Sequence, residues 1–224
     1  MNKFDVQRET TKKYILPLVG DISSLLEIGC GIGGNLSVFN NCTKVVGIDL
    51  SISKCKAARE RTGRIIINND VFNINNIGKF DLIILKDTIE HIKDKEKLLN
   101  HIRIFMTDTS KIFISFPSWY SPFAGHQQCC KSLLRFIPYV HLLPFYEYLL
   151  RLFKEHKEFL EVKDQRITAK EFEAMLIDYR IEYYQPYIIS PSYAHWVKPV
   201  KLPRVLIFLR DYLTTTHYYL INLK

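Results

Sequence analysis

The chain has 224 residues, of which 47% are hydrophobic and 24% are charged, a composition typical of a folded domain and not of a disordered segment. Its formal net charge of +8 is compatible with RNA, an anionic membrane surface or an anionic substrate, and does not choose among them. The five cysteines are odd in number and show no C-x-x-C spacing, which disfavours a disulfide scaffold or a zinc site and favours reduced thiols.

No segment reaches the roughly 18 uninterrupted apolar residues that a membrane span requires. The first 19 residues are too polar for a secretory signal, so we expect a cytoplasmic protein. The length suits a single α/β domain over residues 1–224.

Short apolar segments alternate with amphipathic ones in the first half of the chain. The predicted buried strands are residues 24–28, 44–49, 64–68, 80–85 and 111–116. Helices are predicted over 51–61, with Ser51 or Ser53 as the N-cap, and over 90–106. This alternation predicts a parallel sheet with helices on both faces.

The pattern changes after Pro117. A turn-rich aromatic loop over 119–126 precedes a helical stretch, 132–159, that is interrupted at Pro138 and Pro144. Further on, the sequence predicts a helix from Thr168 to Asp178 with Glu171 completing a capping box, a strand over 181–189, a helix over 203–212 and a strand over 217–223. Residues 118–167 therefore form a predicted helical insertion, or lid, within the single domain.

A glycine-rich turn follows the first predicted strand. Gly29, Gly31 and Gly34 satisfy the G-x-G-x-x-G pattern, which nicotinamide- and flavin-binding domains also use. Glu27 lies two residues before the turn, where a carboxylate would repel a pyrophosphate but can meet a cationic amino group.

Two further carboxylates follow the next two predicted strands. Asp49 lies about 20 residues after the turn, where a carboxylate can accept both ribose hydroxyls. Asp70 could accept from an adenine amino group while a nearby backbone N–H serves the ring. An N-cap role is the alternative interpretation of Asp70.

The sequence resembles the class I S-adenosylmethionine-dependent methyltransferases. Their E/D-x-G-x-G-x-G motif is present from Glu27 to Gly33, and residues 87–92 (DTIEHI) look like the subgroup of the ubiquinone and menaquinone methyltransferases. The resemblance covers residues 10–117 well and 168–190 and 214–223 loosely. It implies a Rossmann-like three-layer sandwich, a mostly parallel seven-stranded sheet of order 3-2-1-4-5-7-6, and S-adenosylmethionine as the cofactor. The cofactor-binding residues that we expect are Glu27, Gly29, Cys30, Gly31, Gly33, Asp49, Leu50, Asp70, Val71 and Asp87.

Two histidines are candidates for the general base, since imidazole titrates near neutral pH. His126 is preferred because its loop follows the fifth strand at the edge where the cofactor would lie. His91 is the alternative base, and a capping or packing role suits it equally well. Trp119, Tyr120 and Phe123 could form the walls of an acceptor pocket, or a hydrophobic plug beneath the insertion.

The reaction that we expect is O-methylation of a small-molecule, lipid-like or glycan acceptor. No metal-ligand cluster is evident, residues 86–89 (KDTI) lack the motif of nucleobase amino methylation, and Pro117 is followed by Ser118 and not by cysteine. An RNA methyltransferase and an inactive binding protein with this fold are the alternatives. Nucleic acid is the less favoured partner because no RNA-binding module is evident. Residues 133–153 could serve as a lid, a dimer face or a peripheral membrane contact, and the oligomeric state is open.

Overall fold

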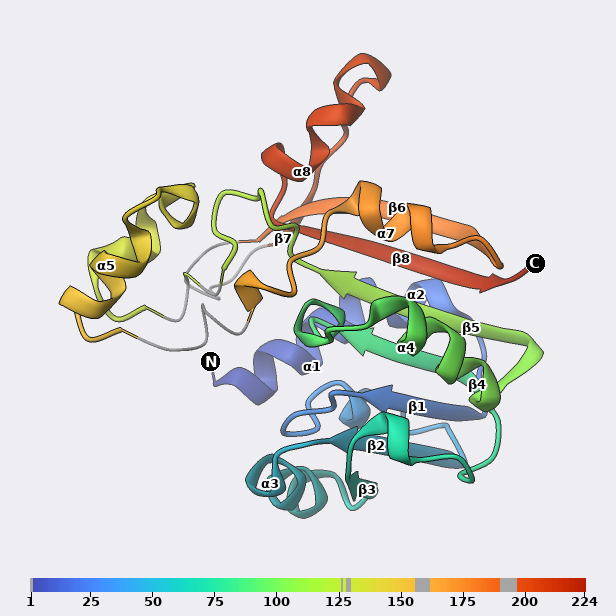
Figure 1. Ribbon diagram of the computed structural model, residues 1–224. Coiled ribbons are helices and arrows are strands. Elements are labelled where there is room, and N and C mark those ends of the chain that lie inside the picture. Colours follow the sequence, from blue (N-terminus) through green and yellow to red (C-terminus); the bar gives the residue numbers. More distant parts are fainter. Residues whose placement is uncertain (1, 126, 128–129, 156–161, 190–196) are drawn as a thin grey trace.

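The computed structural model describes residues 2–125, 127, 130–155, 162–189 and 197–224. In this part of the chain an eight-stranded sheet has the order β3-β2-β1-β4-β5-β8-β6-β7 (Figure 1). Strands β1 to β5 run parallel, and β8 is antiparallel to both β5 and β6. The strands are β1 (Ser24–Ile28), β2 (Lys44–Asp49), β3 (Ile65–Asn68), β4 (Phe80–Lys86), β5 (Met106–Phe116), β6 (Tyr179–Ile189), β7 (Val197–Pro199) and β8 (Thr216–Leu223).

The predicted fold class is confirmed. Strand β8 takes the place of the seventh strand between β5 and β6, so the first seven positions reproduce the order 3-2-1-4-5-7-6. The additional strand β7 is short and pairs with the end of β6 at the edge of the sheet. The sequence did not predict it, because three residues ending in proline carry no alternating pattern.

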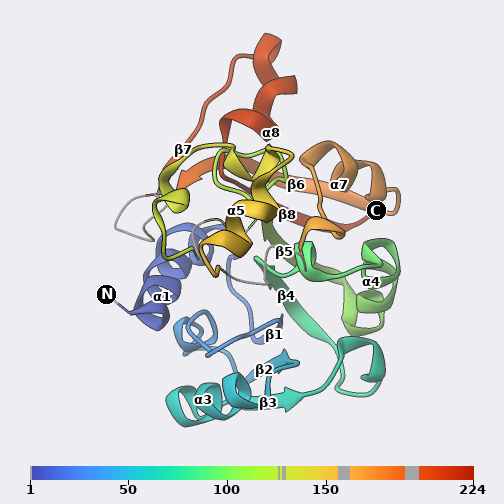
Figure 2. The ribbon, with the colours of Figure 1, turned by 60° about the vertical axis from the view of Figure 1, so that its left-hand side comes forward.

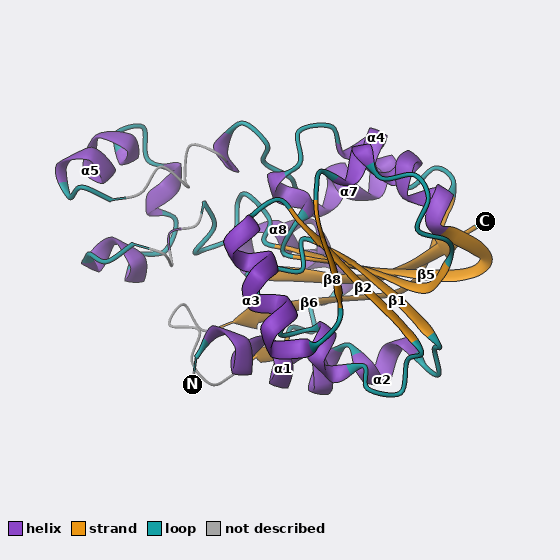
Figure 3. Ribbon diagram, turned by 90° about the horizontal axis from the view of Figure 1, so that it is seen from below, coloured by secondary structure: helices purple, strands orange, loops and turns teal. Residues whose placement is uncertain are grey.

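Helices cover both faces of the sheet (Figure 3). The α-helices are α1 (Lys3–Tyr14), α2 (Leu16–Val19), α3 (Ile52–Thr62), α4 (Lys95–Ile102), α5 (Tyr146–Leu152), α7 (Ala169–Met175) and α8 (Arg210–Leu213). Two predicted caps are confirmed. The Ser51 side chain accepts from the Lys54 N–H at the start of α3, and Thr168 and Glu171 form the capping box of α7.

Two hydrophobic cores lie on the two faces of the sheet, because successive strand residues point to opposite sides. In β4, Ile83 and Leu85 face the core beneath α4 and α7, whereas Leu82 and Ile84 face the core beneath α2 and α3. All four side chains are completely buried. The rigid sheet therefore fixes the position of the loops at the carboxyl ends of its strands.

The long helix predicted over residues 90–106 is wrong. The chain instead forms the 3₁₀ helix η3 (Ile89–His91), then α4, then the 3₁₀ helix η4 (Arg103–Phe105). Asp94 is the cause, since its side chain accepts from the Lys97 N–H at 2.8 Å and so begins a new helix after residue 94. Strand β5 correspondingly begins at Met106, earlier than expected.

The insertion after β5 consists of short helices beyond the carboxyl ends of the parallel strands (Figures 1 and 2). They are η6 (Leu133–Phe136), η7 (Val140–Leu142) and α5, and they alternate with the prolines that were predicted to break the helix. A separate hydrophobic cluster beneath them comprises Trp119, Cys130, Leu134, Val140, Tyr146, Leu150 and Val162. No helix in the described ranges is long and apolar enough to cross a membrane.

Candidate functional site

The glycine turn follows β1 directly and is closed on one side and open on the other. Gly29, Gly31 and Gly33 all have positive φ angles, of 76°, 54° and 83°. A Cβ atom at Gly29 would lie 2.4 Å from the Thr88 Oγ1 atom, whereas one at Gly31 would meet no protein atom within 4 Å. The turn therefore requires glycine at both places, and its open side lies at Gly31.

Asp49 connects the end of β2 to this turn. One carboxylate oxygen accepts from the Gly31 N–H at 2.8 Å, and the other accepts from the Ser51 N–H at 2.8 Å. Since each carboxylate oxygen can accept two hydrogen bonds, Asp49 keeps capacity for a pair of hydroxyl donors. Leu50, the next residue, is 73% exposed beside it.

Glu27 is the least expected group of the turn, because its carboxyl is completely buried. The Oε1 atom accepts from the Asn35 Nδ2 atom at 2.6 Å, but the Oε2 atom has no partner. Burial raises the pKa of Glu27 to about 8, against the Asn35 hydrogen bond and the positive charge of Lys86. A buried carboxylate oxygen without a partner is costly, so this position fits a ligand that carries an ammonium or another N–H donor.

Asp70 and Asp87 lie at the ends of β3 and β4. The Asp70 carboxylate accepts from the Phe72 N–H at 3.0 Å and caps the 3₁₀ helix η2 (Val71–Asn73), so the N-cap interpretation is confirmed. Asp87 has a positive φ of 52°, and its carboxylate accepts from the Ser115 hydroxyl at 3.0 Å. Its side chain is 49% exposed at the edge of the sheet.

Glu90 is a buried carboxyl that the sequence analysis missed. It is 5% exposed, and its Oε2 atom has no partner. Burial, and then the nearby negative charge of Asp87, raise its pKa well above the usual value. A small cavity at the end of β5 is lined by Glu90, Pro117, Trp119, Ala124, Gly125, Val162, Arg166 and Ile167. In the sequence Glu90 fits the polar face of the helix predicted over 90–106, whereas in the structure it lies in η3 and is buried.

The residues predicted to serve as the base or as the walls of the acceptor pocket lie in different environments. His91 is exposed in η3, and His126 lies outside the described residues. Trp119 is 8% exposed, belongs to the insertion's hydrophobic cluster and lines the cavity with Glu90. Tyr120 stacks on Tyr212 with 5.1 Å between ring centroids, and Phe123 is half-buried.

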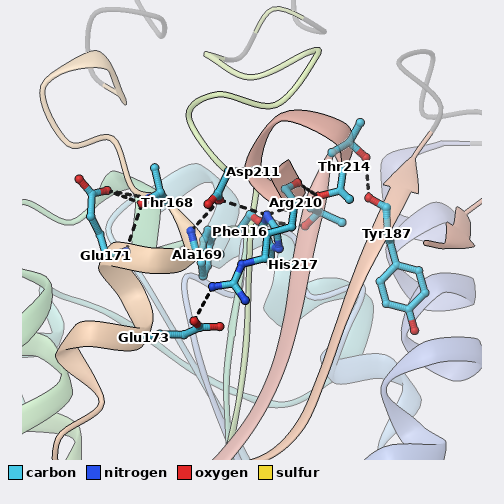
Figure 4. Close-up of polar contacts among 12 residues, drawn as sticks. Phe116, Thr168, Ala169, Glu171, Glu173, Tyr187, Arg210, Asp211, Thr214 and His217 are labelled. Atoms are coloured by element: carbon cyan, nitrogen blue, oxygen red, sulfur yellow. Dashed lines mark hydrogen bonds and ion pairs between the residues drawn. The ribbon is translucent and has the colours of Figure 1, made fainter. Parts of the chain in front are cut away.

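A second buried polar group joins α7, α8 and β8 (Figure 4). The Nε2 atom of His217 lies 3.5 Å from the Asp211 carboxylate, which also accepts from the Ala169 N–H at 2.8 Å. Burial lowers the pKa of His217 to about 4, against the nearby negative charge of Asp211. The group fixes the starts of α7 and α8 to β8, and its role is structural.

Residues that could ligate a metal do not gather in the described part of the chain. No group of three or more His, Cys, Asp or Glu side chains there could hold a metal ion. The four described cysteines (Cys30, Cys42, Cys55 and Cys130) are buried free thiols.

The sheet order and the glycine turn define a Rossmann-like cofactor-binding domain. A model of the methyltransferase domain family matches residues 7–169, and the chain therefore belongs to this family. Together, the family and the fold identify a class I S-adenosylmethionine-dependent methyltransferase.

Curated relatives match the first part of the chain. Phosphoethanolamine N-methyltransferase 1 of Zea mays is 34% identical over 116 residues, which are 48% of this chain and 23% of the relative. Malonyl-[acyl-carrier protein] O-methyltransferase 1 of Ilyobacter polytropus is 33% identical over 100 residues, which are 41% of this chain and 37% of the relative. The matched segment thus spans well under half the length of both relatives.

Solved structures match the whole fold. The plantazolicin methyltransferase BpumL, in complex with a pentazolic desmethylPZN analog and SAH, superposes with a TM-score of 0.59 at 17% identity. The match covers 99% of this chain and 84% of BpumL. It includes the part after residue 169, which the family model leaves unmatched.

Proposed function

We propose that the protein transfers a methyl group from S-adenosylmethionine to an oxygen atom of a small-molecule, lipid-like or glycan acceptor. The observation that carries the proposal is the unpartnered Oε2 atom of Glu27 beneath a glycine turn that is open at Gly31. The amino group of the cofactor supplies the cationic donor that this oxygen lacks.

The remaining cofactor contacts follow from the geometry of the turn. Asp49 would accept the two ribose hydroxyls with the capacity left after its backbone bonds. The backbone of the turn, including Cys30 and Gly33, would line the cofactor, and Leu50 would cover its exposed side. Asp70 and Val71 would border the adenine, and Asp87 the methionine end.

The acceptor would bind on the insertion side of the sheet, near the small cavity that Trp119 and Glu90 line, with Glu90 as the proton acceptor. When bound, S-adenosylmethionine supplies an electrophilic methyl carbon. Glu90, when ionised, would accept the hydroxyl proton of the acceptor on its Oε2 atom as the acceptor oxygen takes the methyl group. The cavity is lined mainly by apolar residues, with Glu90 and Arg166 as the two charged ones. His91 and His126 remain alternative bases.

The named relatives include both N- and O-methyltransferases, so the methylated atom needs a direct test. Cell extract would be incubated with the protein and S-adenosylmethionine labelled in its methyl group, and the products separated by charge and by alkaline hydrolysis. We expect label in neutral ethers or in alkali-labile esters. Label confined to cationic amines would overturn O-methylation, and label in RNA would favour the alternative function.

A further inference from the structure

Exposed apolar side chains are concentrated in two segments. Of the 23 large hydrophobic residues that are exposed in the described ranges, 10 lie in residues 133–153 and 6 in residues 205–213. Leu133 and Val205 are each 77% exposed, and Phe208 is 69% exposed. Soluble domains rarely expose apolar residues at this density without a partner.

The two segments contact each other. The Tyr139 hydroxyl donates to the Tyr212 carbonyl at 2.7 Å, and Tyr120 stacks on the same tyrosine. Both segments protrude from the body of the domain, the insertion from the carboxyl edge and the 3₁₀ helix η8 (Arg204–Leu209) from the neighbouring end of β8 (Figures 1 and 2). We refer to residues 131–154 and 201–213 together as the apolar face.

The charges on the apolar face are mainly positive. Its exposed cations are Lys131, Arg151, Lys154, Lys201 and Arg204, and Arg135 is half-buried among them. Its acids are engaged within the protein: Glu147 pairs with Lys163, and Asp211 is buried against Ala169 and His217. Beside it, Glu155 accepts from the backbone N–H groups of Lys131 and Ser132.

We infer that the apolar face docks on an anionic lipid bilayer. A second copy of the chain is the alternative partner for an exposed apolar face. A symmetric dimer would place these cations against the same cations of the other copy, which is unfavourable. Apolar and tyrosine side chains flanked by Lys and Arg are instead the composition of interfacial membrane contacts. On the proposed function, docking would also bring the side of the sheet that carries Trp119 and Glu90 close to an acceptor held in the membrane.

Co-sedimentation of the whole chain with vesicles tests the docking. Vesicles of phosphatidylcholine alone would be compared with vesicles that contain phosphatidylcholine and phosphatidylglycerol in a ratio of about 7:3. We expect binding to the second set that weakens as the salt concentration rises, because exposed charges are screened. Equal failure to bind both sets would overturn the inference.

Variants locate the contact. Leu133→Asp should weaken binding about tenfold or more, whereas Ile177→Asp should leave it unchanged. Ile177 is the matched control because it is 76% exposed and lies beside the C-terminal residue Lys224, away from the insertion (Figure 1). The double variant Arg151→Glu, Lys154→Glu should weaken binding at least about 25-fold, since each cation near an anionic surface contributes about fivefold. Equal effects of Leu133→Asp and Ile177→Asp would place the contact elsewhere.

Sedimentation velocity without lipid separates docking from self-association. We expect a monomer over the micromolar range. A dimer that Leu133→Asp dissociates would mean that the partner of the apolar face is a second copy of the chain and not a bilayer. Calorimetric titration with S-adenosylhomocysteine serves as a separate readout for the proposed function. Loss of vesicle binding with intact cofactor affinity is expected for the charge-reversal variant, so failure of either proposal can be distinguished from failure of the other.

Discussion

The two sides of the sheet's carboxyl edge are built in different ways. On the side of β1 and β2, short turns hold the buried Glu27 and the backbone-bonded Asp49 over a dense core. On the side of β5, short 3₁₀ helices cover a small separate core and leave many apolar side chains exposed. The side of β1 and β2 is therefore fixed by the sheet, whereas the side of β5 depends on an insertion that the common fold does not specify.

The largest effect is expected at the boundary between the two sides. Glu90→Gln should lower the rate of methyl transfer by about 10²–10⁴-fold, the usual contribution of general acid–base catalysis, with cofactor affinity retained. Glu96→Gln, at an exposed acid of α4, is the control. Steady-state kinetics with an identified acceptor measure the effect. A Glu90→Gln variant with full turnover would mean that His91 or His126 is the general base.

The contrast in packing predicts a contrast in stability. Phe113→Ala should reduce the free energy of unfolding by about 3–5 kcal/mol, because the ring is completely buried in β5 against Tyr218. Leu133→Ala should change it by no more than about 0.5 kcal/mol. Urea unfolding of both variants gives the values. A loss at Leu133 as large as that at Phe113 would mean that the insertion belongs to the main core.

The sequence predicted the side of β1 and β2 better than the side of β5, for physical reasons. The strands β1 to β4 are short and mostly apolar, and the glycine turn follows β1 directly, so both leave a local signal in the sequence. The Thr168–Glu171 capping box of α7 is another local signal, which needs no tertiary contact. The burial of Glu90 and the pairing of His217 with Asp211 depend on segments far apart in the chain. Such contacts leave no periodic pattern, and the short helices after Pro117 have only proline breaks as a signal.

A smaller effect is expected at the end of β2. Asp49→Ala should weaken the binding of S-adenosylhomocysteine by about 1.5–3 kcal/mol, the typical cost of losing a charged hydrogen-bond acceptor. The same substitution frees the Gly31 N–H, so circular dichroism should first establish that the variant is folded. Unchanged affinity in a folded variant would place the ribose elsewhere.

A further prediction concerns the pH dependence of stability, which is measured as a slope and not as a single loss. The pKa of Glu27 in the folded protein, about 8, lies above the ordinary value of 4.5, so the folded state holds an extra proton between these pH values. Stability should therefore fall as pH rises through this window, by up to about 1.4 kcal/mol per pH unit, and level off above pH 8. Glu27→Gln should remove this part of the slope. Urea unfolding at several pH values would measure it, and parallel slopes for the variant and the wild type would contradict the assignment.

The identity of the cofactor can be measured by calorimetric titration, with S-adenosylhomocysteine and NAD as ligands of the wild type and of Glu27→Gln. We predict that the wild type binds S-adenosylhomocysteine and not NAD. Glu27→Gln should weaken this binding, because the ligand's ammonium favours the ionised form of Glu27 and a glutamine cannot supply that charge. Tight binding of NAD without binding of S-adenosylhomocysteine would contradict it.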